Sequence, residues 1–329
     1  MHKLLAVFLL ATFVATTVDA AGVTIAWSPV GNPGNAPDPA TGNGAVNYSY
    51  NIGTTDVTNS QYVQFLNAKD PTGANTLGLY DNTPYGYSTW GGISFNSGAL
   101  NGNKYSVISG DGNHPVNFVN IYDTLRFTNW LNNGQGNGDT ETGAYTLLGG
   151  TPTPSNELTI TRSPGATVFL PNVNEWYKAA NYDPKTNSYF QYPTSSNTLP
   201  TASLPTGAIN SANYNGALAS SPGGLGNLTD VGAYTGTASP YGAQDMVGNV
   251  SQWTETSPDE LGYRIMGTSF ADPTELLTGV FSEVIGAAWG EDQYTGFRVA
   301  SIASVPEPST GVLAAIACGM MWCWRKRFK

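Results

Sequence analysis

Glycine and short polar residues interrupt this sequence so often that long helices and long strands have little room to form. There are 39 glycines among 329 residues, and asparagine, serine and threonine fill much of the chain between them. Such residues favour turns, because glycine reaches backbone angles closed to other residues and short polar side chains bond to nearby backbone groups. Aromatic residues (12%) slightly outnumber charged ones (11%), whereas a disordered chain has few aromatics and many charges. We therefore expect a loop-rich globular body with an aromatic core.

The pattern of apolar residues predicts three short helices and several short strands in this body. Residues 21–45 are expected to be turn-rich, and residues 183–230 are polar and irregular. The expected helices cover 60–68 (with Thr58 or Asn59 as the cap), 119–132 and 174–181, and the expected strands cover 46–52, the surroundings of Ser94 and Val107, 168–171 and short pieces within 233–299.

The N-terminus has the layout of a secretory signal over residues 1–20. A basic start at Lys3 leads into the mostly apolar run 4–15, and small residues follow it. This order of basic, apolar and small residues is what the export machinery recognises. We expect cleavage after Ala20 or Ala21. An uncleaved membrane anchor is the alternative, but the apolar run is short for a span of about 20 residues.

The C-terminus, residues 305–329, has a second pattern that is typical of a targeting signal. Pro-Glu-Pro at 306–308 precedes an apolar run over 311–324, and three cations at 325–327 close it. The positive-inside rule places these cations in the cytoplasm. The alternative is a proline-containing linker before a buried helix. The arrangement resembles the PEP-CTERM sorting signal of certain Gram-negative and related bacteria. That resemblance implies an exosortase-type processing enzyme as partner, a membrane tether before processing, and delivery to the cell surface or extracellular matrix.

Charge and side-chain chemistry exclude several classes of function. The predicted signal is net neutral and the predicted tail is net +3, so a chain charge of −10 leaves the body near −13. So acidic a body does not neutralise phosphates, and we expect no nucleic acid as partner. Both cysteines, Cys318 and Cys323, lie in the C-terminal apolar run, and His114 is the only histidine of the body. The body therefore has no disulfide framework, thiolate metal site or His-rich metal site.

Six short motifs follow one another in a fixed order through the body. They read DVTNSQYVQFLNA at 56–68, HPVNFVN at 114–120, LPNVNEWYKAA at 170–180, YGAQDMVGNVSQW at 241–253, GTSF at 267–270 and GFRVA at 296–300.

Together these motifs resemble the formylglycine-generating, or sulfatase-modifying factor, domain over residues 46–301. The resemblance implies an α+β fold with little regular secondary structure, related to the C-type lectin fold. Each motif also has a structural interpretation. Its aromatic residues supply core area, and Asp123, Glu175 and Arg298 are expected to be buried or half-buried polar ties.

In active members of this family a cysteine pair binds copper(I) and oxidises a sulfatase cysteine to formylglycine. Soft thiolates are the ligands that copper(I) prefers. Ungapped counting from Ser269 places the pair at Asp272 and Leu277, and the arginine that usually precedes the GGS segment is Met266 here. Copper is therefore not expected. A related branch binds iron through histidines and a carboxylate, but His114 alone does not form that site.

The resemblance also implies a calcium loop in the fourth motif. Its ligands would be the side chains of Asp245 and Gln252 and the backbone carbonyls of Gly248 and Val250. Oxygen ligands suit calcium, but Gln252 replaces a carboxylate, so binding would be weaker or lost. The alternative is a turn in which Asp245 accepts backbone N–H bonds.

Two functions remain open from the sequence. The first is a non-catalytic binding or structural module, with a polysaccharide or a surface protein as its partner. Loops rich in asparagine, glycine, threonine and tyrosine suit such recognition, although this argument rests on analogy of fold. The second is an enzyme, a divergent formylglycine-generating oxidase acting on sulfatase cysteine.

Overall fold

The protein is described from a computed structural model that covers residues 22–81, 90–218, 226–257, 262–277 and 283–302. The predicted secretory signal and the predicted sorting signal lie outside these ranges. Three α-helices stand among the described residues: α1 (Asn59–Lys69), α2 (Ile121–Asn132) and α3 (Val173–Asn181). None of the helices in the described part of the chain is long and apolar enough to cross a membrane.

Each helix begins at a capping box, in which the side chains of the cap residue and of the third helical residue bond to each other's backbone N–H. The cap residues are Thr58 for α1, Asn120 for α2 and Asn172 for α3. The sequence predicted either Thr58 or Asn59 as the cap of α1, and the structure shows that it is Thr58. The cap at Asn120 starts α2 two residues later than predicted, because a capping residue has extended rather than helical backbone angles.

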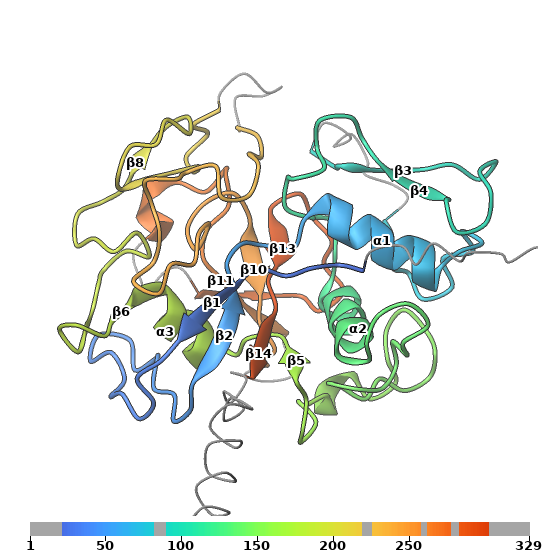
Figure 1. The fold of residues 1–329 in the computed structure, drawn as a ribbon, viewed down its shortest axis with the longest axis horizontal. Coiled ribbons are helices and arrows are strands. Elements are labelled where there is room, and N and C mark those ends of the chain that lie inside the picture. The colour runs from blue at the N-terminus through green and yellow to red at the C-terminus, as the bar shows by residue number, and fades with distance from the viewer. Residues whose placement is uncertain (1–21, 82–89, 219–225, 258–261, 278–282, 303–329) are drawn as a thin grey trace, which may run out of the picture.

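The strands are short and form two four-stranded sheets and three pairs (Figure 1). One sheet has the order β1-β2-β14-β5 and the other the order β12-β11-β10-β13. The strands are β1 (Trp27–Val30), β2 (Tyr50–Gly53), β3 (Ile93–Phe95), β4 (Tyr105–Val107), β5 (Val168–Phe169), β6 (Tyr182–Asp183), β7 (Ser188–Tyr189), β8 (Thr201–Ala202), β9 (Ser211–Ala212), β10 (Ser251–Trp253), β11 (Tyr263–Met266), β12 (Glu283–Gly286), β13 (Thr295–Phe297) and β14 (Ala300–Ile302).

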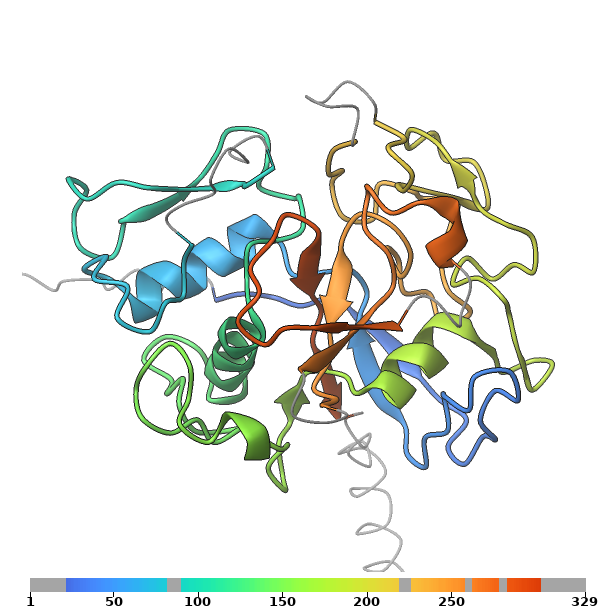
Figure 2. The same cartoon turned by 180° about the vertical axis from the view of Figure 1, so that it is seen from behind.

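The first sheet joins segments from both ends of the described chain. Ile52 of β2 pairs with Ala300 of β14, and Phe169 of β5 pairs with Ala300 from the other side. Figures 1 and 2 both show β2 and β14 side by side in the middle of the molecule. This closure brings the first and last sequence motifs together, which places their polar side chains at one site.

The core is largely aromatic, as the composition predicts. Phe127 of α2 contacts the rings of Tyr62, Phe65 and Phe297, with centroids 5.3 to 5.8 Å apart. Trp130 adds a further ring 5.8 Å from Phe127. Aromatic pairs at such distances stabilise a fold beyond the area that they bury, so this cluster fixes α1 and α2 against β13.

Two expectations about strands need correction. The strand predicted over 46–52 begins only at Tyr50, because Tyr48 is 43% exposed and its hydroxyl turns to the carboxylate of Glu175. The alternation of apolar and polar residues over 46–52 did not indicate that the strand starts at Tyr50. The segment 21–45, expected to consist of turns, contains β1, which pairs with β2 from Trp27 opposite Gly53.

Candidate functional site

The polar residues of three motifs meet at the guanidinium group of Arg298, which is fully buried. Its Nη2 donates to Oδ1 of Asp56 at 2.9 Å, and its Nε donates to Oε1 of Gln252 at 2.7 Å. Further N–H groups bond to the carbonyls of Gly53 at 2.9 Å and Asp245 at 3.1 Å. Arginine suits such a place because its rigid fork of donors satisfies several acceptors at once. Arg298 therefore ties together loops that are far apart in sequence.

Gln252 occupies the centre of this arrangement. Its Oε1 also accepts the indole N–H of Trp176 at 2.5 Å, and its Nε2 donates to the carbonyl of Asp245 at 2.8 Å. Two N–H donors thus converge on one amide oxygen, and the remaining amide group is bonded as well. A buried amide satisfied in this way stabilises the scaffold.

Burial dominates the electrostatics of Asp56. Its second carboxylate oxygen, Oδ2, is buried without a hydrogen-bond partner among the described residues. Loss of solvation, with a smaller contribution from the charge of Asp245, raises the pKa of Asp56 to about 8 against the opposing effect of the Arg298 guanidinium. Desolvation disfavours the charged form of a carboxyl group, so the ionisation state of Asp56 matters for stability.

Glu175 is the centre of a second buried group. Arg162 forms two bonds to it, at 2.9 and 2.7 Å, and the backbone N–H of Asn172 donates to it at 2.7 Å. Arg162 also contacts Glu255 at 2.6 Å and lies 3.6 Å above the ring of Phe169. The prediction that Asp123, Glu175 and Arg298 are buried polar ties is confirmed, since all three are at most 1% exposed.

The predicted calcium residues come together in space, but they fit a calcium ion poorly. The oxygen of Gln252 already accepts two N–H groups, and Arg298 supplies positive charge beside Asp245. Asp245 accepts the N–H of Gly232 at 2.6 Å, and the backbone at Gly248 has a φ of 79°. Calcium binding by Asp245, Gly248, Val250 and Gln252 stays a prediction, and these contacts favour the alternative turn.

The positions that the resemblance assigns to the copper-binding cysteines have structural partners of their own. Asp272 Oδ2 accepts the N–H of Ser269 at 2.6 Å, and Leu277 is 1% exposed in an apolar cluster. Met266 is fully buried. His114 lies 3.6 Å from Asp111, in a loop. In the described part of the chain, no group of three or more His, Cys, Asp or Glu side chains is placed to hold a metal ion.

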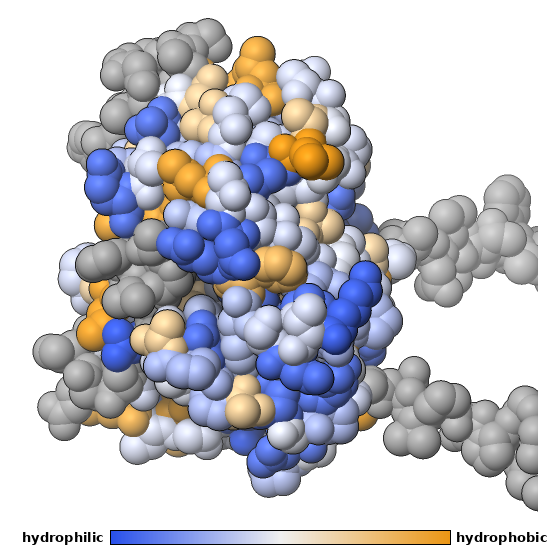
Figure 3. Space-filling view, turned by 90° about the vertical axis from the view of Figure 1, so that its left-hand side faces the viewer, coloured by the Kyte–Doolittle hydropathy of each residue, from blue (hydrophilic) through white to orange (hydrophobic). Residues whose placement is uncertain are grey.

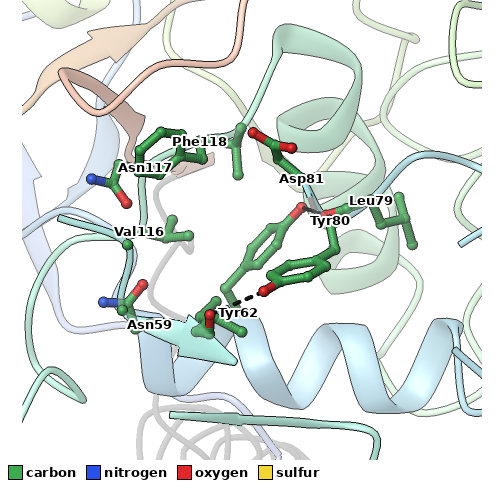
Figure 4. Close-up of a pocket in the computed structure, with 12 residues that line it drawn as sticks. Asn59, Tyr62, Leu79, Tyr80, Asp81, Val116, Asn117 and Phe118 are labelled. Atoms are coloured by element: carbon green, nitrogen blue, oxygen red, sulfur yellow. Dashed lines mark hydrogen bonds between the residues drawn. The ribbon is translucent and has the colours of Figure 1, made fainter. Parts of the chain in front are cut away.

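A pocket that sequence reasoning missed opens beside α1 (Figure 4). Its volume is about 30 Å³, which is room for a small polar group. The first two motifs lie on its wall, but single-sequence periodicity gives no sign that they face one hollow. The residues that line it are Asn59, Tyr62, Leu79, Tyr80, Asp81, Gly91, Gly92, Ile93, Val116, Asn117, Phe118 and Val119.

Comparison with known proteins identifies the family to which the chain belongs. The model of the Sulfatase-modifying factor enzyme 1-like domain matches residues 31–303, so the chain belongs to that family. The expected α+β fold with little regular secondary structure is confirmed. No curated protein matches the chain.

The solved structure of CarF supports this fold. The chain is similar to CarF with a TM-score of 0.56 and 18% identity, covering 85% of this chain and 99% of that one. It is also similar to the Treponema denticola variable protein 1 (TM-score 0.49, 17% identity, coverage 86% and 97%) and to PvdO from Pseudomonas aeruginosa (TM-score 0.47, 17% identity, coverage 85% and 92%). Identities this low concern the fold and leave function open.

Proposed function

We propose that the chain is an exported, non-catalytic binding module built on the sulfatase-modifying factor fold. One observation carries this proposal. Where the family resemblance places the copper-binding thiolates stand Asp272 and Leu277, and both side chains are occupied in the scaffold. Neither supplies the soft sulfur ligand that copper(I) chemistry needs.

The binding partner that we propose is a polysaccharide or a protein at the cell surface or in the extracellular matrix. The described loops carry many asparagine, threonine and tyrosine side chains, which hydrogen-bond hydroxyl groups and stack on sugar faces. Figure 3 shows one side of the molecule, where apolar residues are scattered among hydrophilic ones. A surface of mixed character fits recognition of a hydrated partner.

Delivery to that place would follow from the two predicted address signals at the chain ends. The secretory signal over 1–20 would export the chain, and the PEP-CTERM-like segment over 305–329 would hold it in the membrane until an exosortase-type enzyme removes it. A host with such an enzyme should accumulate processed protein outside the membrane, and a chain truncated before Val305 should bypass the tethered stage.

The proposal is tested by combining a copper determination with a glycan array on the purified full-length chain. We expect substoichiometric copper and retention of at least one class of glycan. Stoichiometric copper would contradict the proposal and favour the alternative, a divergent formylglycine-generating oxidase. Stoichiometric calcium without copper would leave the binding module in place and revive the predicted loop at Asp245.

A further inference from the structure

The wall of the pocket beside α1 has a buried hydrogen-bond acceptor, and no described residue donates a hydrogen bond to it. Asn59 is 1% exposed and lines the pocket, and its Oδ1 has no partner while its Nδ2 donates to the carbonyl of Asp111 at 2.9 Å. A buried polar atom without a partner carries a free-energy cost, because it has lost its water and gained no hydrogen bond. A ligand that donates a hydrogen bond to Asn59 would remove this cost.

The tyrosine hydroxyl groups of the wall can likewise accept a hydrogen bond from a ligand but not donate one. Tyr62 donates its hydroxyl proton to the carbonyl of Leu79 at 2.9 Å, and Tyr80 donates to the carbonyl of Ile93 at 3.1 Å. Both tyrosine protons are thus committed to the backbone. Figure 4 shows the Tyr62 and Tyr80 rings and the Asp81 carboxylate around the hollow. The wall therefore presents hydrogen-bond acceptors and aromatic rings to a ligand.

Charge near the pocket is negative. Asp81 lines it, and Arg126, which acts on Tyr62, is paired with the carboxylate of Glu141 at 2.7 Å. No Lys or Arg is among the described residues that line the pocket. Cations are stabilised both by carboxylates and by aromatic faces.

Phe118 indicates that the wall is held in a strained conformation. Its φ is 52°, which is a true outlier for a bulky residue. Its N–H donates to the carbonyl of Asp292 at 2.9 Å, and Ile121 donates to Ala288 at 3.3 Å, so the loop 288–292 is fastened to this wall. In that loop Trp289 is 74% exposed. Backbone strain of this kind clusters at ligand sites, and an exposed indole suits the face of a sugar.

We propose that this pocket binds the protonated amine of an amino sugar in a surface glycan. The ammonium group would donate to Asn59 Oδ1 and lie against the tyrosine faces near Asp81, with the sugar ring at the pocket mouth toward the loop of Trp289. This inference rests on the proposed binding function and names the chemical class that the module recognises.

The test is calorimetric titration of the purified full-length chain with a glucosamine trimer and with its N-acetylated counterpart at physiological salt. A short oligomer limits nonspecific attraction to the acidic protein. We expect the free amine form to bind at least ten-fold more tightly. Equal affinity for the acetylated trimer would overturn the assignment of an ammonium ligand. A lysine peptide that binds where neither trimer does would overturn the assignment of a glycan.

The site itself is tested by Gly91→Leu. A Cβ at Gly91 would meet only the ring of Phe118, at 3.6 Å, and Gly91 has no left-handed backbone, so leucine would fill the pocket without distorting the chain. The matched control is Gly31→Leu, where a Cβ meets nothing within 4 Å. We expect G91L to weaken binding at least ten-fold, Asp81→Asn to weaken it several-fold, and G31L to leave it unchanged.

These variants separate the inference from the function on which it rests. Glycan binding that survives in G91L would refute this pocket as the site and leave the binding module intact. Copper with oxidation of a cysteine peptide would refute the module itself, whatever the pocket binds.

Discussion

The buried side chain of Arg298 holds together loops that have little regular secondary structure. Its guanidinium bonds to a carboxylate, an amide oxygen and several carbonyls, and no part of it reaches solvent. Removing Arg298 is costly because several buried acceptors then lose their donor and stay unsatisfied. Arg298 is therefore a sensitive point of the scaffold.

Replacing this arginine tests that role. We expect Arg298→Met to lower the free energy of unfolding by about 3–5 kcal/mol, since Asp56 and Gln252 would lose their donor. Lys185→Met, at an exposed cation, should change stability by less than about 0.5 kcal/mol. Urea unfolding measures both. An R298M variant as stable as K185M would show that the buried ties do not hold the fold.

The ionisation of buried carboxyl groups gives a second prediction at the scale of residues. Burial raises the pKa of Asp56 to about 8 and that of Glu291 to about 7, the latter helped by Asp81 and opposed by a bond from Asn120. Between pH 5 and 8 the folded chain then holds protons that the unfolded chain has released. Stability should therefore fall as the pH rises through this window.

Glu291→Gln tests the sign of this effect. The slope of unfolding free energy against pH between 5 and 7 should become less negative by up to about 1.4 kcal/mol per pH unit, and by less where solvent screens the group. Glu275→Gln, at an exposed glutamate, should leave the slope unchanged. The lowered pKa of Lys178, about 8, acts only above this window. Stability that rises from pH 5 to 8 would contradict the account.

At the scale of elements, the helices owe their starting points to local sequence. The Thr58 hydroxyl accepts the N–H of Gln61, and the Gln61 side chain accepts the N–H of Thr58. We expect Thr58→Ala to cost about 1 kcal/mol and Thr58→Ser to cost much less, because serine keeps the capping oxygen. Thermal unfolding compares the pair, and equal losses in both would show that the cap has no role.

This locality explains what the sequence predicted well. The spacing of apolar residues within a helix is a local signal, so all three helices were predicted within two residues of their observed starts. By contrast, Asp56 and Arg298 are 242 positions apart, and their pairing depends on the closure of β2 against β14. The pocket beside α1 also needs three distant segments. Neither feature leaves a periodic trace in one sequence, so the sequence predicted neither the pairing nor the pocket.

At the scale of the whole molecule, the family motifs serve mainly to hold loops together. Four of the six meet at Arg298 and Gln252, and the side chains at the predicted positions of the cysteine pair pack into the scaffold. The hollow that remains beside α1 has acceptors, aromatic faces and negative charge around it. These are the features on which the proposed binding function rests.

The most direct test of this account is mass spectrometry of a cysteine-containing sulfatase peptide after incubation with the full-length chain, copper and oxygen. The account predicts that the peptide leaves with its cysteine unchanged, at the level of a reaction without protein. Conversion of that cysteine to formylglycine with multiple turnovers would contradict it, because the chemistry would then proceed without the thiolate pair.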